Sequence, residues 1–176
     1  MEVKINNSIL SLVEGDLTEQ EVDAIVNAAN RTLMGGGGVD SAIHRAGGKK
    51  VLEQCMLIGG CETGNAVITT GGDLRAKYVI HTVGPVYRDG KHGEPGLLEN
   101  AYRNSLELAA SNGLNSVALP SISTGAYRYP LEEAAEIALK TAIEHLKQET
   151  CIELVRFVLF DHHDLEVYGK VLKGLI

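Results

Sequence analysis

The chain has 176 residues, of which 44% are hydrophobic and 22% charged, a composition that suits one folded domain and excludes a disordered chain. Its 16 Lys and Arg against 23 Asp and Glu give a net charge of −7 without a basic run, which disfavours a broad nucleic-acid surface. No apolar run approaches the ~20 residues of a membrane span, and three cysteines without a C-x-x-C pair favour reduced thiols. These features predict one cytoplasmic domain over residues 1–176, with no stable nucleic-acid or membrane partner.

Short runs rich in β-branched residues predict strands, and segments of helical period lie between them. The predicted strands cover residues 9–13, 23–27, 66–69, 78–83, 116–119 and 155–160. Helices are predicted around residues 98–109, around residues 131–146 and from about Asp164 to Leu172. The first two strands are too close for a crossover helix, so they would pair antiparallel if they were neighbours. This order predicts an α/β fold with a mostly parallel sheet, covered on both sides, whose ligand site lies at the carboxyl ends of the strands.

Four consecutive glycines, Gly35–Gly38, come just before a helical pattern that begins at Val39. Without Cβ atoms, their backbone N–H groups can approach a phosphate closely, and the helix dipole favours an anion there. The run matches neither the dinucleotide fingerprint nor the P-loop, and a flexible loop with a glycine cap is the alternative. The pattern therefore predicts an anion cradle of another kind.

The segment Ser121–Tyr127 also joins a strand to a helix. Its hydroxyls, its glycine and its free backbone amides are suited to a second phosphate, although such residues are also common in ordinary loops. Because position 121 is serine, the esterase motif G-x-S-x-G is absent and no serine nucleophile is predicted.

Asp16 lies just past a predicted strand, and Phe160 ends another. Asp16 is placed to accept hydrogen bonds from the amino group of a ligand. Alternatively, Thr18 and Glu21 form a capping box and the turn only starts a short helix. Phe160 is placed to stack on a planar base, with a core phenylalanine as the alternative.

Two amides and one carboxylate complete the set of candidate polar residues. Asn27 and Asn30 end an apolar strand, where a turn-forming role is the alternative to a functional one. Asp40 lies beside the glycine run and is suited to steering a water or a sugar hydroxyl, or else complements the helix dipole.

The histidines predict structural roles. The segment Asp161–Asp164 has the composition of a metal site, but no third distant ligand set is evident and a helix start capped by Asp161 is favoured. His44 and His81 are isolated in the sequence and are expected to be packed and hydrogen-bonded.

Five segments occur together in the order and spacing of a macro domain: Gly15–Thr18, Val26–Asn30, Gly35–Ile43, Val83–Pro85 and Ser121–Tyr127. The chain resembles this family over nearly its whole length. It is most similar to the MacroD-type branch, which pairs the sequence N-A-A-N with G-G-G-V-D.

The resemblance implies a three-layer α/β/α fold around a mixed six-stranded sheet, with a cleft for ADP-ribose across the strand ends. It implies hydrolysis of ADP-ribosyl esters, namely mono-ADP-ribose on Asp or Glu of proteins and O-acetyl-ADP-ribose, without a cofactor or a metal. A non-catalytic reader of ADP-ribose and a phosphatase for ADP-ribose 1″-phosphate are the alternatives.

The resemblance also implies site roles. Asn30 and Asp40 would be catalytic and face the distal ribose, Asp16 would hold the adenine amino group, and Phe160 would stack near the adenine. The two loops would wrap the diphosphate. The implied ligand-binding residues are Asp16, Leu17, Asn27, Gly36, Gly37, Gly38, Val39, Ser123, Thr124, Gly125, Ala126, Tyr127 and Phe160.

Three positions depart from the pattern of this branch. Ser41 stands where the branch often has glycine, and Gly48 stands where alanine is common. Arg128 is bulkier than the glycine frequent there, which bears on how the loop closes over the distal ribose and thus on the preferred substrate.

Overall fold

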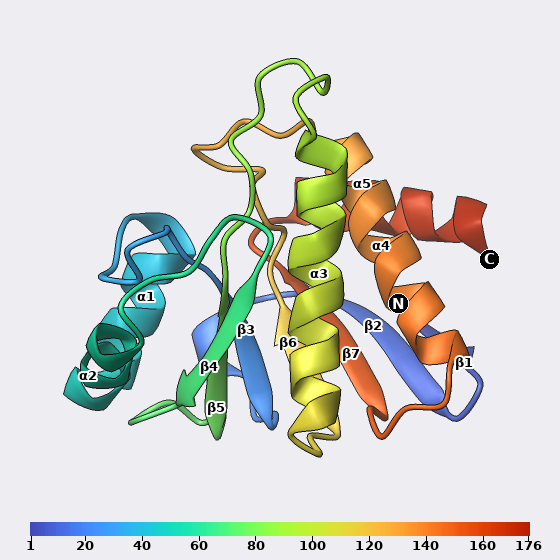
Figure 1. Ribbon diagram of the computed structural model, residues 1–176. Helices are drawn as coiled ribbons and strands as arrows, with labels where there is room; N and C mark the ends of the chain where they lie inside the picture. The colour runs from blue at the N-terminus through green and yellow to red at the C-terminus, as the bar shows by residue number, and fades with distance from the viewer.

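The computed structural model describes residues 1–176 and shows one mixed sheet of seven strands with helices on both faces (Figure 1). Its strands lie side by side in the order β1-β2-β7-β6-β3-β5-β4. The outer pairs β1–β2 and β4–β5 are antiparallel, and the four pairs between them are parallel. The strands are β1 (Glu2–Ile5), β2 (Ser8–Glu14), β3 (Ala24–Ala28), β4 (Ala66–Thr70), β5 (Tyr78–Thr82), β6 (Ser116–Leu119) and β7 (Leu154–Leu159). The predicted α/β class and mixed sheet are confirmed.

The expected number of six strands is wrong by one, because β1 was not predicted. Glu2–Ile5 has only four residues and two of them are charged, so its own pattern is weak. It becomes a strand by pairing with β2 across a tight turn, in a register that places Ile5 opposite Ser8. The second and third strands of the chain are not neighbours: β2 pairs with β1 and β7, whereas β3 pairs with β5 and β6.

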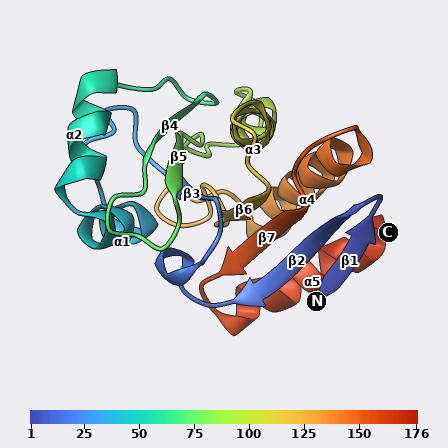
Figure 2. The same cartoon turned by 90° about the horizontal axis from the view of Figure 1, so that it is seen from below.

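Five α-helices and one short 3-10 helix connect the strands. They are η1 (Leu17–Glu19), α1 (Gly38–Gly47), α2 (Lys49–Ile58), α3 (Glu94–Ser111), α4 (Leu131–Lys147) and α5 (His162–Leu175). Figures 1 and 2 show α1 and α2 on one side of the sheet and α3 and α4 on the other. The helical pattern predicted from Val39 corresponds to α1, and the other three predicted helices correspond to α3, α4 and α5, each with somewhat wider bounds.

The two faces of the sheet pack against two different apolar clusters. The larger has 28 buried residues and joins the sheet to α3, α4 and α5, while a cluster of eight lies towards α1. Within β6, Val117 and Leu119 belong to the larger cluster and Ala118 to the smaller one, as the period of two along a strand requires. Burial on both faces explains why the central strands read as continuous apolar runs.

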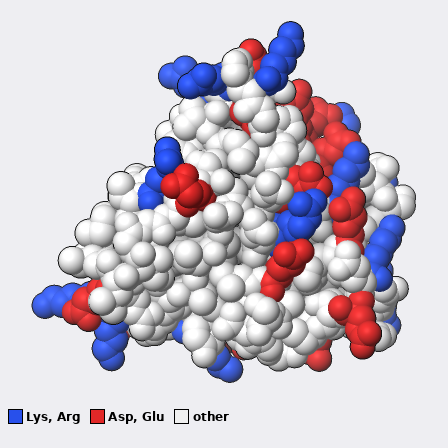
Figure 3. Space-filling model, viewed as in Figure 1, with Lys and Arg blue, Asp and Glu red and all other residues white.

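Charged side chains do not form an extended surface of one sign on the face seen in Figure 3, where acidic and basic groups often lie next to one another. Basic atoms occur at the tips of the loops at the top of that view. No helix is both long and apolar enough to cross a bilayer, and Cys55, Cys61 and Cys151 are all unpaired thiols.

Candidate functional site

The predicted site residues gather at one edge of the sheet because β2, β3, β5, β6 and β7 run parallel, so their carboxyl ends coincide. In Figure 1 this edge is at the top, where the loops after β3, β5 and β6 emerge. The glycine run follows β3, and the segment Ser121–Tyr127 follows β6. The prediction that the unusual residues lie at the carboxyl ends of the strands is confirmed.

The glycine run leads directly into a helix, as predicted. Helix α1 begins at Gly38 with Gly37 as its N-cap, and no side chain caps its first turn. Gly35 and Gly38 have φ angles of 98° and 60°, which glycine adopts without strain. Uncapped backbone N–H groups at the positive end of a helix are suited to binding an anion.

Asn30 and Asp40 meet at the glycine loop. The Asn30 Nδ2 donates to the carbonyl of Gly35 at 2.8 Å, and its Oδ1 accepts from the Thr32 hydroxyl at 2.7 Å. Asp40 is only 3% exposed. A Cβ added to Gly36 would lie 3.2 Å from both Asn30 Nδ2 and Asp40 Oδ2, so the absence of a side chain at Gly36 leaves room for both groups. The structure therefore brings together the two residues expected to be catalytic.

Asn27 occupies a different place from the other predicted ligand-binding residues. It is fully buried behind Asp40, and its Nδ2 donates to Asp40 Oδ1 at 2.8 Å. The same Nδ2 lies 3.1 Å from His81 Nδ1, while the Asn27 Oδ1 has no hydrogen-bond partner. The Asn27 side chain thus holds Asp40 by a hydrogen bond from the interior of the protein.

The second loop is held in shape by its own backbone and by a close neighbour. Ser123 has a φ of 67°, its carbonyl accepts from Tyr129 N at 2.8 Å, and its hydroxyl is buried without a partner. A Cβ at Gly84 would overlap with side-chain atoms of Ser123 and Ile122. Gly84, which follows β5, is therefore needed for the close approach of the two loops.

The tip of the second loop is open. Gly125 and Ala126 are exposed, Thr124 donates to the Ser121 hydroxyl at 2.9 Å, and Arg128 N donates to the carbonyl of Gly125 at 3.0 Å. Tyr127 O accepts from Tyr87 N at 2.9 Å, which ties this loop to the one after β5.

Asp16, Leu17 and Phe160 lie at the ends of β2 and β7. Asp16 is the N-cap of η1, and its Oδ1 accepts from Thr18 N at 2.9 Å and from the Thr18 hydroxyl at 2.7 Å. The cap is thus Asp16, and not Thr18 as the capping-box alternative required. Leu17 is 4% exposed and belongs to the smaller core, so only its backbone is available to a ligand. Phe160 is 89% exposed, which rules out the core alternative.

The histidine predictions are largely confirmed. Asp161 caps α5 by accepting from Asp164 N at 2.9 Å. His81 is fully buried with partners on both ring nitrogens, Asn27 at Nδ1 and Thr69 Oγ1 at Nε2, 2.9 Å away. His44 was expected to be hydrogen-bonded and is not: its Nε2 lies 3.3 Å from Asp40 Oδ1, but both of its ring nitrogens lack a hydrogen bond.

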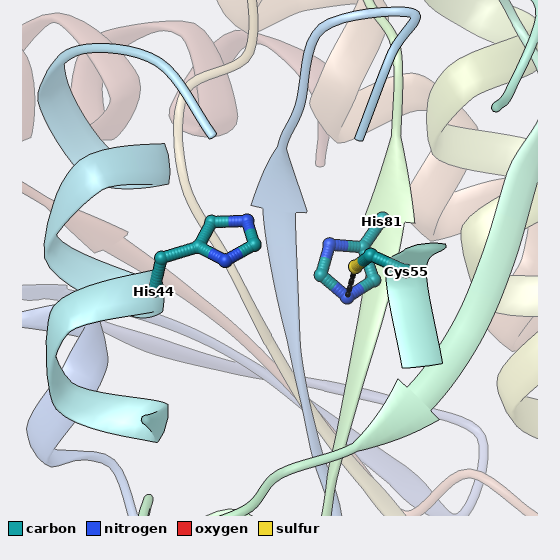
Figure 4. A group of neighbouring side chains, drawn as sticks. All are labelled: His44, Cys55 and His81. Carbon is teal, nitrogen blue, oxygen red and sulfur yellow. Dashed lines mark hydrogen bonds between the residues drawn. The ribbon is translucent and has the colours of Figure 1, made fainter. Parts of the chain in front are cut away.

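His44, Cys55 and His81 converge from α1, α2 and β5, a cluster that sequence reasoning missed because its members are far apart in the chain (Figure 4). Their donor atoms lie within 4.8 Å of one another, and these residue types are metal ligands. However, the hydrogen bonds of His81 already occupy both ring nitrogens. Burial, followed by the charge of Asp40, raises the pKa of the Cys55 thiol to about 11, which disfavours the thiolate. In this structure Cys55 and His81 are thus part of a hydrogen-bonded interior, whereas His44 has no hydrogen bond.

A cavity of about 740 Å³ lies next to the candidate site, and Arg31, the residue after Asn30, is part of its lining. It is lined by Arg31, Thr32, Met34, Met56, Gly59, Gly60, Cys61 and Glu62. It lies beside the loops expected to wrap a diphosphate and contains none of their residues.

Known proteins match the chain over most of its length. A family model described as the Macro domain matches residues 26–138. A macro domain-containing protein of Chlorobaculum tepidum is 54% identical to this chain, and the alignment covers 95% of this chain and 97% of the relative. The O-acetyl-ADP-ribose deacetylase of Salmonella newport is 53% identical, and the alignment covers 94% of each protein. The solved macrodomain of Oceanobacillus iheyensis with ADP is 43% identical, covers 99% of this chain and 95% of its own, and has a TM-score of 0.95. A macrodomain of Trypanosoma brucei in complex with ADP-ribose is 42% identical, covering 92% and 68%, with a TM-score of 0.86. The chain therefore belongs to the macro domain family.

Proposed function

We propose that this chain is a macro domain hydrolase that binds ADP-ribose and cleaves ADP-ribosyl esters. Its substrates are mono-ADP-ribose on Asp or Glu side chains of proteins and O-acetyl-ADP-ribose. Relatives that are 51 to 53% identical and named O-acetyl-ADP-ribose deacetylase support this activity. Residues 1–176 act in it as one macro domain.

One observation carries the proposal: Asn30 and Asp40 face each other across Gly36, at the mouth of an uncapped helix N-terminus. Asn30 fixes the hydroxyls of the distal ribose, and Asp40 orients the attacking water or a ribose hydroxyl. An ester is activated enough to be cleaved by a positioned water, without a metal or a covalent nucleophile. Positioning of this kind contributes up to ~7–11 kcal/mol to a rate.

The remaining residues bind the rest of the ligand. The Asp16 carboxylate accepts from the adenine amino group, and the exposed ring of Phe160 stacks near the adenine. Backbone N–H groups of Gly36–Val39 and Ser123–Tyr127 hold the diphosphate, because both segments present open backbone at the same edge. Asn27 belongs to the site through Asp40.

The partners that follow from this proposal are ADP-ribosylated proteins and the free ester. We also propose a cytosolic location, which the three unpaired cysteines favour. A net charge of −7 argues against nucleic acid as a partner, since the cleft holds a single small dianion through backbone groups.

The test is a titration of ADP-ribose by calorimetry, followed by incubation of catalytic amounts of protein with a glutamate-linked mono-ADP-ribosylated substrate. Binding together with release over many turnovers supports the hydrolase. Binding without release makes the protein a reader, and phosphate release from ADP-ribose 1″-phosphate alone makes it a phosphatase. No binding of ADP-ribose contradicts the whole assignment.

A further inference from the structure

A chain of buried polar side chains runs from Asp40 into the sheet, away from the glycine loop. Asn27 Nδ2 lies 2.8 Å from Asp40 Oδ1 and 3.1 Å from His81 Nδ1. On the far side of the ring, His81 Nε2 lies 2.9 Å from Thr69 Oγ1. Figure 4 shows the His81 ring standing on β5 next to Cys55, with His44 facing it from α1.

The backbone fixes the relative positions of these side chains. Asn27 and His81 are paired residues in the parallel register of β3 and β5, so both side chains point to the same face of the sheet. Both are fully buried, and Thr69 is 3% exposed. An unpaired polar group among side chains this deeply buried is costly.

The chemistry of each group determines the direction of every hydrogen bond. If the Asn27 amide were reversed, its Oδ1 would lie against a carboxylate oxygen, which is repulsive; its NH₂ group therefore faces Asp40 and uses its second hydrogen towards His81. The His81 Nδ1 must then accept, so Nε2 carries the ring proton and donates to Thr69. The Thr69 hydroxyl donates onward to the carbonyl of Thr70 at 3.0 Å.

We propose that His81 is a positioning residue for the hydrolysis, holding the Asn27 amide and through it the Asp40 carboxylate in place at the glycine loop. The proposal rests on the proposed function, in which Asp40 acts on the bound substrate. His81 itself touches no ligand, since it is fully buried beneath Asn27.

Two further observations support this role. Burial, with the nearby His44 as a second cause, lowers the pKa of His81 to about 3, so the ring is neutral and its Nδ1 lone pair is available near neutral pH. The Asn27 Oδ1 has no partner, so the amide is held only by Asp40 and His81. Without His81, the Asn27 amide keeps only its hydrogen bond to Asp40 and is free to rotate about it, which leaves His44 Nε2, 3.3 Å away and without a hydrogen bond, as the other neighbour of Asp40 Oδ1.

The experiment compares His81→Leu, which removes the acceptor and keeps an apolar volume, with His81→Asn, whose Oδ1 can occupy the position of Nδ1. Release of ADP-ribose from the ester substrate gives kcat, and calorimetry gives the Kd for ADP-ribose. We expect His81→Leu to lower kcat roughly ten- to a hundredfold with little change in Kd, because small misplacements of catalytic groups have effects of this size. We expect His81→Asn to recover most of the loss.

Ser105→Ala is the matched control for stability. Ser105 is fully buried on α3, on the opposite face of the sheet, and its hydroxyl donates only to the carbonyl of Ala101. This variant should lower the melting temperature without changing kcat. The proposal is overturned if folded His81→Leu keeps the kcat of the wild type, or if His81→Leu lowers kcat and raises Kd by similar factors and His81→Asn restores neither.

Nitrogen NMR of the wild-type protein provides a readout that needs no activity. We expect His81 Nδ1 to be unprotonated and Nε2 protonated, and the Asn27 side-chain amide to exchange slowly and to shift in Asp40→Ala. A protonated Nδ1 or a rapidly exchanging amide overturns the proposal, even if the protein releases no ADP-ribose and the proposed function itself fails. If His81→Leu does not fold, Thr69→Val tests the same series of hydrogen bonds. We expect it to lower kcat by less than tenfold, and an unchanged kcat would be the contrary result.

Discussion

At the scale of single residues, the site is arranged around Asp40. A buried carboxylate is costly unless it is hydrogen-bonded, and Asp40, at 3% exposure, meets this need through the Asn27 amide on Oδ1. Its Oδ2 lies next to Gly36, 3.2 Å from the position that a Cβ of this residue would occupy. One carboxylate oxygen is thus anchored and the other faces the glycine loop, which suits a group that accepts a proton or orients a hydroxyl.

Asp16 gives the first prediction, because its cap and its expected ligand contact can be separated. Asp16→Asn keeps an oxygen for Thr18 N and removes the charge, so we expect ADP-ribose binding to weaken by about 1.5–3 kcal/mol with the fold retained. Thr18→Ala is the control, since it removes the hydroxyl contact and leaves the carboxylate. Calorimetry distinguishes the ligand contact of Asp16 from its capping role: unchanged affinity in Asp16→Asn would limit Asp16 to the cap.

The location of most candidate site residues at one edge of the sheet was predictable from the sequence, because each follows its own strand. Asp16 follows β2, the glycine run follows β3 and Phe160 follows β7, and parallel strands bring these ends together. The environment of Asn27 was not predictable in this way. It depends on the register between β3 and β5, which pairs Asn27 with His81 across 54 positions of the chain.

At the scale of elements, the structure explains one departure from the MacroD-type pattern. Gly48 separates α1 from α2 with a φ of 77°, a region in which alanine is strained. A Cβ there would also lie 2.9 Å from Asp73 Oδ2. Glycine is therefore the residue that this junction requires in this chain.

The segment between β5 and α3 is held by one carboxylate. The Glu94 Oε2 accepts from the backbone N–H groups of Arg88, Asp89 and Gly90, and its Oε1 accepts from His92 N. Burial of Glu94 opposes its ionisation, but these backbone donors outweigh it and lower the pKa from 4.5 to about 2. Because Tyr87 N donates to the carbonyl of Tyr127, this segment also supports the second site loop.

Glu94 gives the second prediction, a dependence of stability on pH. A lowered pKa in the folded state adds stability that is fully present above about 4.5 and is lost as the pH falls through about 2. We expect Glu94→Gln to be less stable than the wild type at pH 7, with a difference that shrinks below pH 4.5 and disappears near the pKa of about 2. Urea unfolding at several pH values measures it, and a difference independent of pH would contradict this role.

The elements also show where sequence patterns fail. The long helices α3 and α4 were predicted because many residues share one period, whereas β1 has four residues and depends on β2. Its neighbour in space, and not its own sequence, makes it a strand.

At the scale of the whole molecule, the division between core and site is visible in the two phenylalanines of the chain, three positions apart. Phe157 is fully buried, with its ring centroid 6.0 Å from that of Tyr102 and 5.7 Å from that of Tyr168. Phe160 follows the end of the same strand and is 89% exposed. The first ring stabilises the fold, and the second is free for a ligand.

This pair gives the third prediction. Phe157→Ala should lower the free energy of unfolding by about 3–5 kcal/mol, since it opens a cavity in the larger core. Phe160→Ala should leave stability within about 0.5 kcal/mol of the wild type, because the exposed ring has few contacts within the protein. The same variant should weaken ADP-ribose binding, because the proposed stacking on the adenine is lost. Denaturant unfolding and calorimetry on both variants measure the two effects. A large loss of stability in Phe160→Ala, or unchanged affinity, would remove Phe160 from the site.

The central claim is that Asp40 makes this macro domain an enzyme, and the most direct test compares wild type and Asp40→Ala in the same two measurements. These are the Kd for ADP-ribose and the kcat for release of ADP-ribose from a glutamate ester. We expect multiple turnovers by the wild type, and in the variant a fall in kcat far greater than any change in Kd. If Asp40→Ala retains turnover, or if its kcat, affinity and melting temperature fall together, Asp40 is a structural residue and this account of the site is wrong.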